Sequence, residues 1–62
     1  MGTLIHHIEY LTDDGPVAET IWTGPLEGII RIAKETMAKK GATHARIIVE
    51  STGEKVWSGN RD

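Results

Sequence analysis

The sequence has no cysteine and no phenylalanine, and its only aromatic residues are two tryptophans and one tyrosine. Without cysteine the chain can form no disulfide and no thiolate centre. No apolar run approaches the roughly 20 residues of a membrane span, and no basic segment followed by an apolar one marks a secretory signal. The net charge of −2 gives no broad basic footprint for nucleic acid. These absences favour a cytoplasmic protein that does not contact membranes.

The length of 62 residues predicts one domain over residues 1–62, with a frayed end at residues 59–62. A chain this short buries only about 60% of the surface that its unfolded form exposes, so its stability is expected to be marginal. Small domains without disulfides often gain stability by oligomerising, which favours a homodimer.

One amphipathic helix over residues 25–40 organises the pattern. Proline is favoured at the first helical position, here Pro25, and Gly41 follows as the expected left-handed cap. The first turn carries an acid and the last turn two lysines, as the helix dipole favours. The apolar residues fall on one stripe at about 100° per residue: Leu26, Ile29, Ile30, Ala33 and Met37.

Two helix positions depart from this pattern. Gly28 costs roughly 1 kcal/mol against alanine in a helix interior, and Ile32 lies at the border of the stripe. We expect the glycine to allow a close approach to the sheet edge and the isoleucine to cover a sheet margin. The alternative is that both residues flank a contact with a second subunit.

The segment from Thr3 to Leu11 alternates in polarity and predicts a strand. One of its faces carries an acid, Glu9, so we place the other face inward. The inward set is Leu4, His6, Ile8 and Tyr10. The outward set is Ile5, His7, Glu9 and Leu11.

A turn over residues 12–16, rich in aspartate, glycine and proline, leads to a second strand over residues 17–22. The phase of this strand is open. An inward Ile21 would bring Glu19 inward as well. An inward Trp22 brings only small or hydroxylated residues with it, so we favour that phase.

Residues 43–51 form the clearest predicted strand, with an inward set of Ala45, Ile47 and Val49. The outward set is His44, Arg46, Ile48 and Glu50. A three-residue loop that ends in glycine, residues 51–53, leads to a short last strand over residues 55–58. Val56 and Trp57 are neighbours there, so we expect them on opposite faces.

The predicted fold class is α+β, with the element order β-β-α-β-β. A connection through one helix returns the third strand parallel to the second, so that it can pair antiparallel with the first. This arrangement gives a four-stranded antiparallel sheet in the order 2-1-3-4, with one helix packed on one face. The short last strand and the proline-led second strand are then the edges, where proline is tolerated.

The sheet face opposite the helix must meet water or a partner. Several large apolar side chains are predicted there among charged ones, and contiguous apolar patches usually mark interaction surfaces. The alternative is a set of scattered surface aliphatics, which are normal in small domains. The candidate interaction face is Ile5, His7, Leu11, His44, Arg46, Ile48 and, if Val56 faces the core, Trp57.

The histidines do not predict a metal centre. His6 and His7 are neighbours on a strand, so their rings point to opposite faces and cannot chelate one ion together. His7 and His44 could meet across two strands, assisted by Glu9 or Glu50, but no short-spaced Cys/His motif demands it. We expect no metal and no cofactor.

Catalytic motifs are missing as well. The sequence has neither a G-x-S-x-G nucleophile elbow nor a glycine-rich phosphate loop. So small a domain also has little room for a deep cleft that excludes water. We therefore expect a noncatalytic protein-interaction module that forms a homodimer or binds another protein through the open face or an edge strand.

The alternative function is single-stranded nucleic-acid binding on the open face. Aromatic side chains on an open sheet can stack bases while basic ones meet phosphates. The residues for this role would be Trp57, Arg46, His44 and Lys55. The absence of an aromatic RNA-binding pattern and the negative net charge make this hypothesis second.

Four short runs carry a resemblance: Ile29-Ile30-Arg31-Ile32-Ala33-Lys34, Lys40-Gly41-Ala42, Ile47-Ile48-Val49-Glu50 and Gly53-Glu54-Lys55-Val56. This pattern resembles small bacterial and phage domains of unassigned function, in which a hairpin, one helix ending in glycine and a last hairpin form the whole chain. Some small phage-encoded inhibitors share the plan. The resemblance covers the C-terminal two thirds and implies a fold outline, but no catalytic residue.

Overall fold

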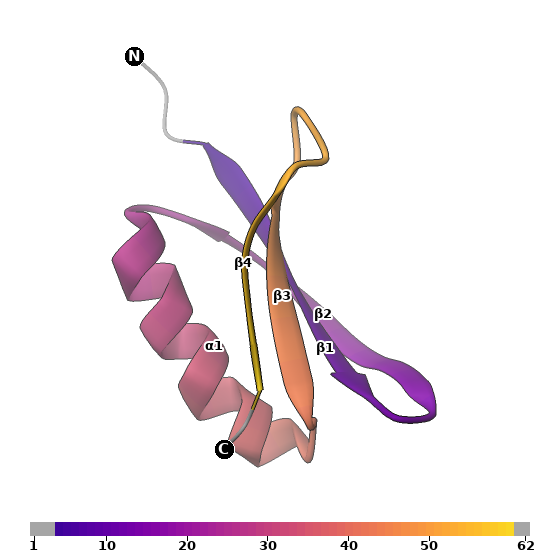
Figure 1. The fold of residues 1–62 in the computed structure, drawn as a ribbon. Coiled ribbons are helices and arrows are strands. Elements are labelled where there is room, and N and C mark those ends of the chain that lie inside the picture. Colours follow the sequence, from indigo (N-terminus) through magenta and orange to yellow (C-terminus); the bar gives the residue numbers. More distant parts are fainter. Residues whose placement is uncertain (1–3, 61–62) are drawn as a thin grey trace.

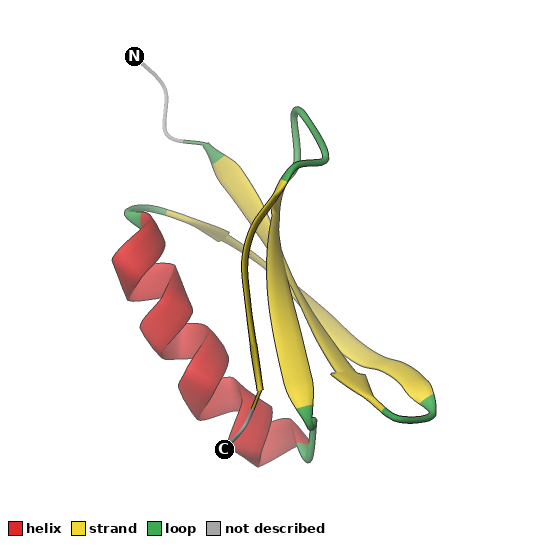
Figure 2. Ribbon diagram, in the orientation of Figure 1, coloured by secondary structure: helices red, strands yellow, loops and turns green. Residues whose placement is uncertain are grey.

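Four strands and one helix follow one another in the computed structural model, which describes residues 4–60 (Figure 1). The order β-β-α-β-β confirms the predicted α+β class, and Figure 2 shows the helix lying along one side of the strands. The elements are β1 (Ile5–Thr12), β2 (Gly15–Thr23), α1 (Leu26–Lys40), β3 (His44–Val49) and β4 (Lys55–Asn60).

The sheet has the predicted strand order, β2-β1-β3-β4, and each neighbouring pair is antiparallel. β1 and β3 are central, and the chain returns through α1 to place β3 beside β1. The helix contacts β1, β2 and β3, so it covers one face of the sheet and leaves the other open.

The helix ends where its sequence predicts. Pro25 is the N-cap residue rather than the first helical residue, and its carbonyl accepts hydrogen bonds from the N–H groups of Gly28 (3.1 Å) and Ile29 (3.2 Å). Gly41 closes the helix with φ 70°, a left-handed conformation that glycine adopts without a Cβ penalty. The predicted span of residues 25–40 is therefore confirmed apart from the proline, because Pro25 has the extended ψ of 140°.

The core lies between the helix and the inner faces of β1 and β3. The inward sets predicted for these strands are confirmed by their buried members, which are His6, Ile8, Tyr10, Ala45, Ile47 and Val49. The helix stripe buries Ile29, Ala33 and Met37, whereas Leu26 and Ile30 are half-buried at its borders. Leu4 was predicted to face inward, but it is 54% exposed because it precedes the first paired residue of β1.

The first hairpin is tighter than predicted. The expected turn over residues 12–16 shrinks to Asp13 and Asp14, and β2 begins at Gly15. A bulge absorbs the difference, because Tyr10 pairs with Ala18 whereas Leu11 pairs with Pro16. Proline is tolerated within this strand because β2 is an edge strand.

The favoured phase of β2 is confirmed. Trp22 lies opposite His6, Thr20 opposite Ile8 and Ala18 opposite Tyr10, so these side chains share the face that the helix covers. Trp22 is nevertheless 39% exposed, because β2 is at the margin of the sheet.

The last strand departs from its prediction. Ile47 pairs with Trp57 but Ile48 pairs with Lys55, so that Val56 is an extra residue in a bulge. Val56 and Trp57 are both partly buried against the core, and their expected placement on opposite faces is wrong. The strand also continues to Asn60, which contradicts the predicted fraying at residues 59 and 60; residues 61 and 62 lie outside the described range.

Of the predictions for the two unusual helix positions, the one for Gly28 is wrong and the one for Ile32 agrees with the structure. A Cβ placed on Gly28 would meet only the side chain of Pro25, at 3.9 Å, so the expected close approach to the sheet is wrong. Ile32 is partly buried against the core cluster, as expected for a residue that covers a sheet margin.

Candidate interaction surfaces

The open face collects six of the seven predicted interaction residues. In the pairing of β1 with β3, His7 lies opposite Ile48, and Leu11 lies opposite His44. Directly paired residues of antiparallel strands share a face, so these side chains lie together, away from the helix. The six residues are Ile5, His7, Leu11, His44, Arg46 and Ile48. Trp57 is the exception, because it packs on the core side.

A polar network crosses the middle of this open face. His7 lies between two carboxylates, with Nδ1 3.1 Å from Oε2 of Glu19 and Nε2 3.2 Å from Oε1 of Glu50. Beside it, the guanidinium of Arg46 donates to the carboxylate of Glu9. The charges at the centre of the face are therefore paired with one another, which makes this region a poor match for an apolar partner.

The same geometry makes His7 sensitive to pH. A neutral imidazole carries one N–H and can donate to only one of the two carboxylates, whereas the protonated ring donates to both. Hydrogen bonds that His7 donates to the carboxylates of Glu50 and Glu19 raise the pKa of His7 above its ordinary value of 6.5. Protonation of His7 thus strengthens the hydrogen bonds that link β1 to β2, through Glu19, and to the residue after β3, Glu50.

Most of the exposed large apolar side chains of the described strands lie on β2, and one more, Ile5, lies on β1. Val17 is 51% exposed, Ile21 is 61% exposed and Trp22 is 39% exposed. The sequence analysis identified β2 as an edge but named none of these residues as interaction residues. Their exposure was readable in principle, because an edge strand that begins with proline has no second neighbouring strand to bury its apolar side chains.

The other edge strand, β4, differs from β2 in its length and in its first residue. It has six residues against nine in β2, a bulge interrupts it, and a lysine begins it. Short strands, bulges and lysines are the devices by which sheets protect an exposed edge. Of the two edges, β2 is the longer one, and its proline and bulge lie near its start, so its pairing is uninterrupted from Ala18 to Thr23.

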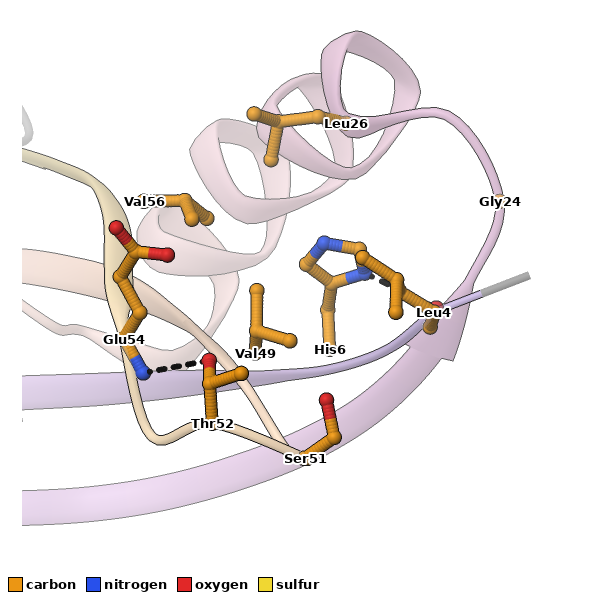
Figure 3. A pocket seen from close by; sticks show the side chains of 9 residues that line it. All are labelled: Leu4, His6, Gly24, Leu26, Val49, Ser51, Thr52, Glu54 and Val56. Carbon is orange, nitrogen blue, oxygen red and sulfur yellow. Dashed lines mark hydrogen bonds between the residues drawn. The ribbon is translucent and has the colours of Figure 1, made fainter. Parts of the chain in front are cut away.

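A separate apolar groove opens between the start of the helix and the ends of the central strands (Figure 3). It encloses about 450 Å³. Aliphatic side chains form most of its wall, His6 lies at its base, and Glu54 stands at its rim. The residues that line it are Leu4, His6, Gly24, Leu26, Val49, Ser51, Thr52, Glu54 and Val56. The sequence analysis missed this groove because its wall comes from four separate segments.

Metal and nucleic-acid binding find little support in residues 4–60. Within this range no group of three or more His, Asp or Glu side chains is arranged to hold a metal ion. The nucleic-acid hypothesis depended on Trp57 as a stacking platform, but this side chain packs against the core, and Arg46 is paired with Glu9. The one helix in the described range is too short and too polar to cross a membrane.

The geometry defines a small α+β domain with an open antiparallel sheet, one exposed apolar edge and one apolar groove. Comparisons of this chain with known protein families, curated proteins and solved structures find no match.

Proposed function

We propose that this protein is a noncatalytic interaction module that self-associates by pairing its β2 edge with the β2 edge of a second copy. The observation that carries the proposal is the exposure of three large apolar side chains on this edge strand, Val17, Ile21 and Trp22, with Ile21 on the open face and Trp22 on the helix-covered face. Large hydrophobic side chains on an exposed edge strand favour pairing with another chain.

The backbone supports the same partner. Among residues 4–60, β2 is hydrogen-bonded to β1 on one side only, so within this range no strand lies beside the N–H and C=O groups on its other side. Pairing two copies antiparallel about a twofold axis would satisfy these groups and produce one continuous eight-stranded sheet. Because both partners present the same surface, such an interface closes as a dimer.

Charge disfavours one register of this pairing. A register with Glu19 opposite its own copy would place two carboxylates side by side, which is destabilising. With Thr20 opposite its own copy, Glu19 instead lies opposite the partner's Ile21, and Ala18 lies opposite the partner's Trp22. Of the registers that separate the two carboxylates, we choose the one with Thr20 at the twofold axis for the test below.

The first test is the solution mass of the protein by light scattering over a concentration series. We expect a wild-type dimer and at least a tenfold weaker association for Ile21→Lys, because a charge on the edge opposes strand pairing. Ile48→Lys is the matched control, because Ile48 lies on the same face as Ile21 but on the central strand β3, and it is expected to leave the dimer intact. A wild-type monomer at every concentration, or a stronger effect of the Ile48 substitution, would contradict the proposal.

The register has its own test, which exploits the absence of cysteine. Opposed residues in antiparallel strands have Cα atoms about 4.5–5.5 Å apart, within the range that a disulfide spans. We expect Thr20→Cys to give a covalent dimer on mild oxidation. Glu19→Cys and Ile21→Cys are expected to crosslink much less, and efficient crosslinking by either would identify a different register.

A further inference from the structure

The apolar groove contains one polar side chain that is almost fully buried. His6 is only 6% exposed, and its ring lies at the base of the groove, under Leu26 and beside Val49 (Figure 3). Burying a polar ring among aliphatic side chains is costly unless its nitrogen atoms are satisfied. The partners of the two nitrogens therefore decide what this groove can hold.

One nitrogen has an internal partner that also sets the tautomer. Nδ1 of His6 lies 3.2 Å from the carbonyl oxygen of Leu4. A carbonyl can only accept a hydrogen bond, so Nδ1 carries the proton and donates it. In the neutral ring Nε2 then has a lone pair and acts as an acceptor.

The other nitrogen faces the groove. Among residues 4–60, no group donates a hydrogen bond to Nε2 of His6, and this atom is not sealed from the groove. Figure 3 shows the ring turned so that Nδ1 points toward Leu4 and the second nitrogen points into the space below Leu26. An accessible acceptor at the base of an apolar groove favours a ligand with a hydrogen-bond donor.

The walls limit the charge of that ligand. Leu4, Leu26, Val49 and Val56 are aliphatic, and among residues 4–60 no lysine or arginine lines the groove. An anion would find no cation there and would meet the carboxylate of Glu54 at the rim. A cation would lose its hydration against the four aliphatic side chains, but Glu54 and the hydroxyls of Ser51 and Thr52 also line the groove, so the test includes a cationic probe.

We propose that this groove is a binding site for a small uncharged molecule with an apolar body and one hydroxyl or N–H group, which donates to Nε2 of His6. The groove volume of about 450 Å³ lies in the range of small-molecule sites. None of the residues that line this site belongs to β2, although Trp22 of that strand lies opposite His6, so the site does not require self-association.

Three probes of similar size test the proposal by NMR titration of the folded protein. Phenol has the donor, toluene lacks it, and benzylamine replaces it with a cation. We expect phenol to bind about three- to tenfold more tightly than toluene, the factor that one net hydrogen bond supplies. The amide signals of Val49 and Val56 are expected to shift, whereas those of Val17 on the far edge are not.

Two variants test separately the role of the acceptor atom, Nε2 of His6, and the role of the groove volume. His6→Phe keeps a ring but removes Nε2, so phenol and toluene are expected to bind equally. Val56→Phe fills the groove and is expected to abolish the binding of both, whereas Val17→Phe is the matched control on the exposed edge. If His6→Phe does not fold, the wild-type protein still gives the answer, because phenol and not toluene must shift the ¹⁵N signal of Nε2.

Each contrary outcome overturns a stated part of the proposal. Equal binding of phenol and toluene to the wild type would remove the role of His6. Tightest binding of benzylamine would show that the site selects cations. Binding that persists unchanged in Val56→Phe, or the absence of any shift at Val49 and Val56, would remove the site itself.

Discussion

The two faces of the central strands give neighbouring residues opposite environments. Ile47 is fully buried under the helix, whereas the next residue, Ile48, is half-buried on the open face. His6 is buried with its ring in an apolar groove, whereas His7 bridges two carboxylates on the open face of the sheet. Residue type alone therefore predicts neither stability nor function in this sheet, because the strand period of two decides which environment each residue meets.

The largest expected effect comes from the adjacent isoleucines. Ile47→Ala should lower the free energy of unfolding by about 2–5 kcal/mol, because it leaves a cavity in the core. Ile48→Ala should cost about 1 kcal/mol or less, since its side chain is only half-buried. Urea denaturation measures both, and the pair Ile47→Val and Ile48→Val repeats the comparison if the first variant does not fold. Equal losses would contradict the difference between the faces.

The second-largest loss of stability is expected for a substitution at Gly59, on the core side of β4. An alanine Cβ at Gly59 would lie 2.6 Å from Cζ2 and 2.7 Å from Cη2 of Trp57, so the indole must move. We expect Gly59→Ala to destabilise the protein by about 1–3 kcal/mol, the usual cost of overpacking, and to change the tryptophan fluorescence. Ser58→Ala, at the neighbouring exposed position, is the control and should change neither quantity appreciably.

A smaller effect of opposite sign is expected on the helix, away from both sheet faces. Because a Cβ at Gly28 meets only Pro25, at 3.9 Å, Gly28→Ala should stabilise the protein by about 1 kcal/mol. Gly41→Ala is the contrasting variant, because φ of 70° strains an alanine there, and it should destabilise. Thermal unfolding measures both, and a loss of stability in Gly28→Ala would restore the idea of a tight contact at this position.

The smallest effect is a pH dependence confined to the open face. The folded-state pKa of His7 is raised above 6.5 by its bonds to Glu50 and Glu19. Its contribution to stability is therefore fully present below pH 6.5 and is lost as the pH rises through the raised folded-state value. Denaturation across this range should show the loss in the wild type but not in His7→Gln. His44→Gln is the control on the same face and should keep the wild-type profile.

Much of the fold could be predicted from local periodicity. The stripe of Ile29, Ala33 and Met37 and the alternation through Ile8 and Ile47 each reflect a repeat within one element, so they are readable without knowledge of the neighbours. The strand order followed from a single helical connection between two hairpins. The phase of β2 was predicted correctly because the alternative would have placed an acid in the core.

The errors arose where one segment depends on another. The bulge at Val56 follows from the register of β4 against β3, which no property of residues 55–58 reveals. The spare space at Gly28 depends on the crossing of helix and sheet. The second bulge, beside Leu11, shortened the predicted turn for the same reason.

By itself, the sequence determined the element types, their order and which side of each central strand meets the helix, because these properties depend on spacing along the chain. Only the tertiary structure decided that the open face pairs its charges internally, that apolar side chains gather at the β2 edge, and that His6 lies at the base of a groove. The physical reason is that such surfaces are built from residues distant in sequence, whose positions depend on register and packing.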